Sequence, residues 1–202
     1  MAIEEGLIIK SPSELSTMRR AGRIVALTLE VLEATITAGM RTTDLDSIAE
    51  AEIRRHGAVP SFIGYRGFPA SICVSINEEI VHGIPGDKLI KDGDIVSIDV
   101  GAIIDGFHGD AAITVGVGKI TDRSQDLIDT TKEALSSGIT AAKVGARMGD
   151  VSASVQDVAE SKGYSVVKEY VGHGIGRKMH EEPAVPNYGR AGRGVLLQNG
   201  MA

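Results

Sequence analysis

Apolar residues recur every three or four positions through residues 15–36, a spacing that predicts an amphipathic helix of about six turns. The segment Ser11-Pro12-Ser13-Glu14 marks its start, because it supplies an N-cap serine, a proline at the first helical position and a glutamate three residues after the cap. The apolar positions of this helix are Leu15, Met18, Gly22, Val25, Leu29, Leu32 and Ile36. A second helix is predicted from near Thr43 to Gly57.

The pattern changes after the second helix. Residues 70–76 and 94–118 are rich in apolar and β-branched side chains, which favours strands. Asp105-Gly106 separates two apolar runs in the second of these segments, and this dipeptide is typical of a two-residue β-hairpin turn. Helical spacing then returns over residues 127–135 and again over 151–158, where Gly163 marks the end of the helix.

The second pair of helices repeats features of the first. Four residues are matched 106 positions further along the chain: Gly39, Arg41, Asp44 and Gly57 by Gly145, Arg147, Asp150 and Gly163. The repeat predicts an α/β (α+β) fold in which one domain, residues 1–202, consists of two related halves, about 9–120 and 121–202. Because residues 200–202 align with the entry to the first hairpin, we expect the C-terminal strands of the second half to be missing from a truncated chain.

Composition narrows the class of protein. With 43% hydrophobic and 24% charged residues, the chain resembles an ordinary globular domain. A net charge of −6 disfavours a nucleic-acid partner, and the sequence has no apolar run long enough to suggest a membrane partner. The single cysteine, Cys73, excludes an intramolecular disulfide and a zinc site of several thiolates. We expect a cytoplasmic monomer.

Two aspartates fall on the predicted hairpin. If Ile104 pairs with Phe107 across the turn, position 99 lies opposite 112 and position 101 opposite 110, so Asp99 and Asp110 become diagonal neighbours on one face. Carboxylates that share a site repel each other unless one is protonated or a cation lies between them, and carboxylate-bridged metal pairs serve many hydrolases. The alternative is two separate exposed aspartates, but the apolar sequence around Asp99 favours a metal site.

The chain has five histidines, and each is a candidate site residue. His173 and His180 lie in the segment GHGIGRKMHEEP, and because they are seven residues apart, a turn must intervene if both serve one site. His82 lies in a loop-like segment, and its role is open on local grounds. His108 shares the face of the aspartates, whereas His56 precedes a glycine that ends a helix and fits a C-cap. The glycines of GHGIGR match no nucleotide-binding motif.

Three segments together resemble the type I methionine aminopeptidases of the pita-bread metallopeptidase family. They are NEEIVHGIPGD, SIDVGAIIDGFHGDAAIT and EYVGHGIGRKMHEEP, and the resemblance extends from about Ile9 to the last residue. It implies a pita-bread fold, with two pseudo-symmetric α/β halves around a central metal site. It also implies a hydrolase that removes the initiator methionine from the N-termini of nascent polypeptides, in the cytoplasm and at the ribosome, when the second residue is small.

The resemblance implies roles for individual residues. Asp99, Asp110 and His173 match three of the family's five metal-ligand positions, and the cofactors implied are two divalent ions (Mn, Fe, Co, Ni or Zn). His82 and His180 match two histidines that contact the substrate near the scissile bond, and we interpret both as catalytic. The implied methionine pocket comprises Phe62, Tyr65, Phe68 and Cys73, with Met179 at a position that is often phenylalanine.

The mechanism implied is attack of a metal-activated water on the first peptide bond. His180 would help to stabilise the oxyanion, and His82 would position the backbone of the scissile peptide. The two glutamates that complete the family's ligand set have no counterpart in these 202 residues, so we expect reduced metal occupancy and little activity. A catalytically impaired fragment or peptide-binding module is the first alternative, and an X-Pro dipeptidase, which shares the fold and the ligands, is the second.

Overall fold

The computed structural model describes residues 6–202. The chain folds into two compact units. We call Ser13–Gln125 the hairpin unit, and residues 126–202 together with the N-terminal segment up to Pro12 the histidine unit. The helices are α1 (Pro12–Thr35), α2 (Thr42–Arg55), the short 3₁₀ helix η1 (Tyr65–Gly67), α3 (Asp122–Ala141) and α4 (Met148–Ser161). The strands are β1 (Val59–Pro60), β2 (Ile72–Ile76), β3 (Ile95–Ile104), β4 (Phe107–Gly116), β5 (Gly172–Gly174) and β6 (Glu181–Val185).

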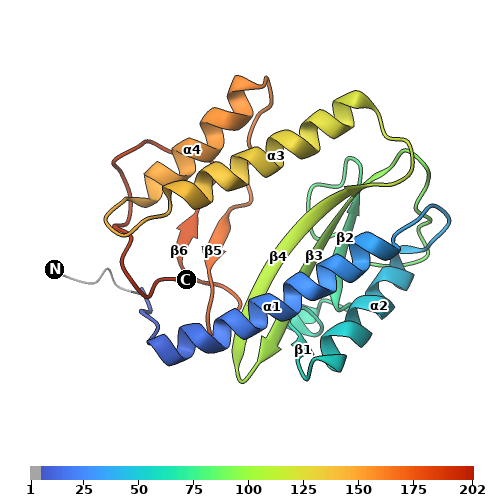
Figure 1. Cartoon of the computed structure of the whole chain (residues 1–202), viewed down its shortest axis with the longest axis horizontal. Coiled ribbons are helices and arrows are strands. Elements are labelled where there is room, and N and C mark those ends of the chain that lie inside the picture. The colour runs from blue at the N-terminus through green and yellow to red at the C-terminus, as the bar shows by residue number, and fades with distance from the viewer. Residues whose placement is uncertain (1–5) are drawn as a thin grey trace. The chain divides into compact units, whose positions relative to one another are not determined.

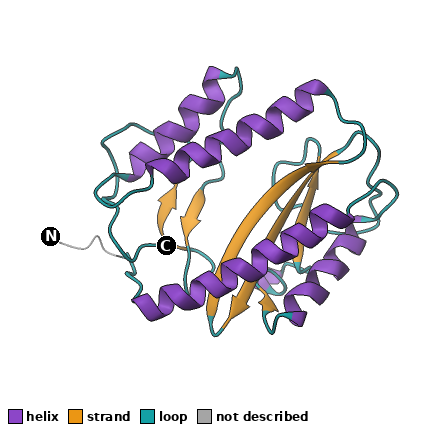
Figure 2. Ribbon diagram, in the orientation of Figure 1, coloured by secondary structure: helices purple, strands orange, loops and turns teal. Residues whose placement is uncertain are grey.

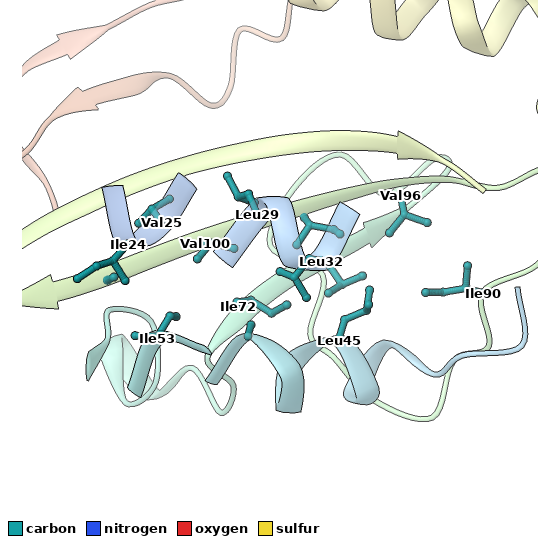
Figure 3. Packing of buried hydrophobic residues seen from close by; sticks show 14 of the residues in the cluster. Ile24, Val25, Leu29, Leu32, Leu45, Ile53, Ile72, Ile90, Val96 and Val100 are labelled. Carbon is teal, nitrogen blue, oxygen red and sulfur yellow. The ribbon is translucent and has the colours of Figure 1, made fainter. Parts of the chain in front are cut away.

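The hairpin unit contains an antiparallel sheet with two helices on one face (Figure 1). Strand β4 pairs along the whole of β3, so β1 and β2 share the opposite edge of β3. The helix α1 begins at Pro12, as the capping sequence predicts. Val25, Leu29 and Leu32 of its predicted apolar stripe are buried in the core (Figure 3). Gly22 is exposed, and Ala21 is buried instead. The core also includes Leu45, Ile53, Ile72, Val96 and Val100.

The predicted β3–β4 hairpin is confirmed in position and register. Ile104 pairs with Phe107, and the turn between them has positive φ angles of 50° at Asp105 and 76° at Gly106. Positive φ at both positions is what a two-residue hairpin of the favoured hand needs. Alternate residues of β3, from Val96 to Ala102, are buried beneath the helices. The intervening residues, which include Asp99, therefore lie on the other face of the sheet.

The histidine unit contains α3 from residue 126 onward, α4 and the two-stranded antiparallel sheet of β5 and β6 (Figure 2). The N-terminal segment of the chain belongs to this unit, because Leu7 forms a parallel bridge with Glu182 and the amide of Lys10 donates to the carbonyl of Gly200 at 2.8 Å. No helix within residues 6–202 combines the length and hydropathy that a bilayer crossing requires.

The two helix pairs share the local geometry that the sequence repeat predicts. The carboxylate of Asp44 accepts the backbone N–H of Arg41 at 2.7 Å, and Asp150 accepts that of Arg147 at the same distance. Both bonds satisfy backbone donors at a helix N-terminus. All four glycines of the repeat have positive φ angles: Gly39, Gly57, Gly145 and Gly163. The repeat is therefore present in the local backbone structure as well as in the sequence.

Candidate functional site

The carboxylate pair, Asp99 and Asp110, lies on the face of the β3–β4 hairpin that points away from the helices. Asp99 is opposite Ala112 and Asp110 is opposite Gly101, which confirms the diagonal placement predicted from the sequence. The two carboxyl groups share a hydrogen bond, which requires a proton on one of them. The alternative of two separate exposed aspartates is thus wrong, because the side chains meet and both residues are partly buried.

Burial raises the pKa of Asp110, and the hydrogen bond with Asp99 opposes that rise only in part. A raised carboxyl pKa means that negative charge is disfavoured at this point of the sheet. A cation beside the pair would remove the need for a shared proton, because it compensates both charges. This electrostatic state is the feature of the hairpin unit that best fits a metal ion.

Cys73 lies directly opposite Asp99, on the neighbouring strand β2. Burial raises the pKa of its thiol to about 12, and the negative charges of Asp99 and Asp110 add to the effect. The thiol is therefore protonated at neutral pH, and Cys73 acts as a small apolar group rather than as a nucleophile or thiolate ligand. This property suits the pocket-lining role that the sequence suggests.

An aromatic wall stands beside the carboxylate pair. A Cβ atom at Gly101, two residues from Asp99 and on the same face, would lie 2.6 Å from Cε1 of Phe62, so Phe62 packs directly over the glycine. The ring of Phe62 meets that of Phe68 edge-on, with centroids 6.5 Å apart. Strand β3 therefore brings Phe62, with Phe68 against it, over Gly101, the residue opposite Asp110. An amino acid with a Cβ at position 101 would push this wall away from the carboxylates.

The segment that follows β1 carries Tyr65 and also contacts His108 of β4. Tyr65 begins η1, and the guanidinium of Arg66 lies 5.5 Å from its ring centroid. His108, opposite Ile103 on the hairpin, shares a 3.0 Å hydrogen bond between its Nδ1 and the hydroxyl of Ser61. His108 is therefore connected to the segment that carries Phe62 rather than isolated at the hairpin turn.

His82 is held by a loop that is joined to β2. The residue has a positive φ of 60°, and the next residue, Gly83, packs so closely on the strand that an added Cβ would lie 2.1 Å from the carbonyl oxygen of Val74. The amide of Val74 donates to the carbonyl of Gly83 at 2.9 Å. Further along, the hydroxyl of Thr42 and the backbone of Gly86 exchange two hydrogen bonds. These contacts fix the backbone of the loop that carries His82.

The histidine unit brings His173 and His180 together. His173 lies on β5, and residues 175–180, which we call the histidine turn, connect β5 to β6. The two imidazole rings are 4.1 Å apart between centroids, at 41° to each other. The intervening turn that the sequence required is thus confirmed. Nδ1 of His173 lies 2.9 Å from the carbonyl oxygen of Gly174, which can only accept, so Nδ1 carries a proton and a metal would bind at Nε2.

A cleft of about 400 Å³ opens beside these histidines, and both of them line it. Ile8 and Val171 give part of the wall an apolar character, whereas Lys178 and Glu182 contribute polar groups. Met179, the other predicted pocket residue of this region, is buried in the histidine turn. The cleft is therefore large enough and mixed enough in polarity to accept a peptide.

Each unit contains donor atoms of a kind that divalent transition metals accept. Asp99 and Asp110 supply carboxylates in the hairpin unit, and His173 supplies an imidazole in the histidine unit. Within residues 6–202, no three His, Cys, Asp or Glu side chains form a ready-made ligand group. Mixed carboxylate and imidazole donors suit Mn, Fe, Co, Ni and Zn.

One feature near the histidines was missed by the sequence analysis. Lys10 and Glu181 form an ion pair at 2.9 Å in which both side chains are only 2% exposed. Lys10 ends the apolar run Leu7-Ile8-Ile9, which is the one signal in the sequence that its side chain is covered. Nothing in the local sequence links it to Glu181, because the pairing depends on the tertiary fold.

The chain matches the model of metallopeptidase family M24 over residues 16–202, and it belongs to that family. Methionine aminopeptidase 1 of Bacillus subtilis is 52% identical over 195 residues, which cover 96% of this chain and 79% of that protein. The crystal structure of methionine aminopeptidase from Rickettsia prowazekii matches with a TM-score of 0.95 at 41% identity, covering 96% of this chain and 79% of that one. The prolidase from Pyrococcus furiosus matches less closely, with a TM-score of 0.83 at 25% identity over 96% and 55% of the two chains.

These similarities confirm the predicted pita-bread fold and the predicted class of enzyme, an aminopeptidase that is a hydrolase. Family membership also implies a divalent metal cofactor. The roles of the individual site residues rest on the geometry described above.

Proposed function

We propose that this chain removes the N-terminal methionine from polypeptides whose second residue is small. The observation that carries the proposal is the carboxylate pair, because Asp99 and Asp110 share a hydrogen bond beside the wall formed by Phe62 and Phe68. The similarity to proteins named methionine aminopeptidase supports the choice of substrate.

Asp99, Asp110 and His173 would hold the metal. A bound divalent ion would supply a water that ionises near neutral pH and would polarise the peptide carbonyl. The chain's own contribution is to present two carboxylates from adjacent strands and the Nε2 lone pair of His173. The hydrogen bond from Nδ1 to Gly174 fixes the tautomer of that histidine, which is the usual arrangement for a metal-binding imidazole.

The remaining residues bind and orient the peptide. His180 would donate a hydrogen bond to the carbonyl oxygen of the first peptide bond, where charge develops during hydrolysis, and His82 would hold the backbone at the scissile bond. Phe62, Phe68, Tyr65 and Cys73 would enclose the methionine side chain. Because these groups are apolar or aromatic and the Cys73 thiol is protonated, they exclude water and select methionine by shape and burial.

The number of metal ions bound is part of the proposal. These 202 residues supply three of the five ligand positions that the family resemblance implies, so we expect fewer than two divalent ions per chain. Isothermal titration with Mn²⁺ and with Co²⁺ would give the stoichiometry. Two tightly bound ions would show that other donors of the chain complete the site.

The decisive assay is methionine release from Met-Ala-Ser and from Met-Leu-Ser, with metal content measured on the same sample. Slow release from the first peptide alone, with fewer than two metal ions bound per chain, is the expected result. An Ala-Pro dipeptide should be included, because prolidases share the fold, and its hydrolysis without methionine release would favour an X-Pro dipeptidase instead. Peptide binding without hydrolysis would favour a binding module.

We propose nascent polypeptides as the substrates, with the chain acting as a monomer in the cytoplasm and meeting them at the ribosome. The support is chemical, since the initiator methionine is present on chains that have just been made. Light scattering would give the oligomeric state, and cosedimentation with ribosomes would test the encounter.

A further inference from the structure

The ion pair between Lys10 and Glu181 is unusual because both side chains are buried from solvent. The ammonium Nζ and the carboxylate Oε2 are 2.9 Å apart, and each side chain is 2% exposed. In the exposed pair Lys88–Glu79 the atoms are equally close, at 2.8 Å, but the two side chains are 50% and 40% exposed. Burying two charges costs desolvation energy that their attraction repays only when the geometry is good, so a buried pair is weak evidence for stability alone. It is better explained as a device that fixes one conformation.

The carboxylate of Glu181 forms the centre of the histidine turn. Its Oε1 accepts the amide N–H of Lys178 at 3.0 Å, while Oε2 faces Lys10. A Cβ at Gly176 would lie 2.6 Å from Oε1, so the backbone of the turn passes directly over the carboxylate. The turn is therefore folded around a charge, and its shape depends on that charge staying in place.

The backbone segment that carries Lys10 is itself held in place by contacts with Gly200 and Glu182. Its backbone N–H donates to the carbonyl of Gly200 at 2.8 Å, and a Cβ at Gly200 would lie 2.8 Å from the carbonyl oxygen of Lys10, so the two backbones are in close contact. Three residues earlier, Leu7 is bridged to Glu182. The backbone that positions the Lys10 ammonium beside the histidine turn is therefore fixed by contacts within the same unit.

The residue next to Glu181 is His180, whose ring packs on that of His173 at a centroid distance of 4.1 Å. We propose that Lys10 is a positioning residue: through Glu181 it holds the histidine turn in the conformation that keeps His180 against His173 at the cleft. The importance of this position for catalysis rests on the proposed aminopeptidase function. The placement itself depends only on contacts within the histidine unit.

The competing explanation is that the ion pair is a brace that raises stability without setting the place of His180. The two explanations differ in what happens to the imidazole contact when Lys10→Met removes the ammonium. A brace lowers the melting temperature and leaves the rings together. A positioning device releases the turn, because an unpaired buried carboxylate must move toward water.

The test is a nuclear Overhauser measurement on protein labelled with ¹³C-histidine. The wild-type chain should give cross-peaks between the ring protons of His173 and His180, and Lys10→Met should lose them while core methyl signals persist. Lys10→Arg, which keeps the charge, should restore them, and Lys162→Met serves as the matched control at an exposed ion pair. Cross-peaks of unchanged intensity in Lys10→Met would overturn the proposal, as would their absence in the wild type.

If Lys10→Met does not fold, Glu181→Gln carries the test, because it keeps the side-chain length and an acceptor for the Lys178 amide but removes the charge. Weaker ring cross-peaks in that variant are expected, and unchanged ones would reject the role of the charge. In metal-loaded protein, Lys10→Met should lower kcat/KM for Met-Ala-Ser by about 10- to 100-fold, the usual effect of losing a supporting contact. The ring measurement needs no activity, so failure of the aminopeptidase function would be recognised separately.

Discussion

Asp99 and Asp110 lie diagonally across the β3–β4 ladder and share a hydrogen bond between their carboxyl groups, although each residue pairs with a different partner on the opposite strand. Burial raises the pKa of Asp110, so negative charge is disfavoured on this face of the sheet. A cation bound beside this pair would therefore stabilise the two carboxylates in a hairpin that is otherwise apolar around Asp99. This stabilisation links the fold of the hairpin unit to metal-dependent chemistry.

Asp110→Asn should separate metal binding from stability. The amide removes the second carboxylate, so divalent metal binding and methionine release should fall by more than the roughly 10- to 100-fold that loss of a ligand's supporting contact costs. The metal-free protein should be as stable as the wild type or slightly more so, because the substitution removes a carboxyl whose pKa is raised by burial. Calorimetric metal titration and thermal unfolding in EDTA would measure the two effects.

The matched control for that variant is Asp105→Asn, in the turn of the same hairpin. Asp105 is exposed and pairs with Arg20, and Asn-Gly is as well suited to this turn as Asp-Gly. Its metal affinity should match that of the wild type. Loss of metal binding in Asp105→Asn, or retention in Asp110→Asn, would contradict the assignment of the carboxylate pair.

The thiol of Cys73 should be inert in the folded protein. Burial raises its pKa to about 12, so at pH 8 the thiolate fraction is on the order of 1,000-fold below that of an ordinary cysteine. Because Cys73 is the only cysteine, iodoacetamide labelling followed by mass spectrometry reports on it alone. Labelling should be slow in buffer and rapid in guanidinium chloride, and rapid labelling of the native protein would show that the pocket wall is open.

The hairpin and its carboxylates could be predicted from the sequence because the information is local. A two-residue turn of Asp-Gly fixes the register, and the register decides which side chains meet. The turn between His173 and His180 was likewise predictable, since their spacing excludes a single strand serving both.

Long-range packing could not be predicted in the same way. No local signal in the sequence marks Gly101 or Gly83, yet each is required by the close approach of another segment, Phe62 in one case and the backbone of Val74 in the other. The Lys10–Glu181 pair joins the two ends of the sequence, and no spacing rule connects residues so far apart. Such contacts follow from how the elements pack, which periodicity does not specify.

Acid should weaken the contact between Lys10 and Glu181. Burial acts to raise the pKa of Glu181, but the Lys178 amide and the Lys10 ammonium outweigh it, and the net pKa is lowered. A carboxyl whose pKa is lower in the folded state contributes stability above its unfolded pKa and loses it as pH falls through the folded value. The melting temperature of the wild type should therefore drop more steeply between pH 5 and pH 3 than that of Glu181→Gln. Parallel curves for the two proteins would contradict this contribution.

Gly101→Ala should damage the aromatic wall rather than the metal ligands. The new methyl group would lie 2.6 Å from Cε1 of Phe62 and 2.7 Å from Cβ of Ser61, so the segment must shift, at a cost of about 1–3 kcal/mol in unfolding free energy. Because Asp99 and Asp110 keep their side chains, metal affinity should change little, whereas KM for methionine peptides should rise. Gly22→Ala provides the control, since it faces open space on α1 and should stabilise by about 0.5–1 kcal/mol. If Gly101→Ala left KM unchanged but reduced metal affinity, Phe62 would belong to the support of the metal ligands and not to the methionine pocket.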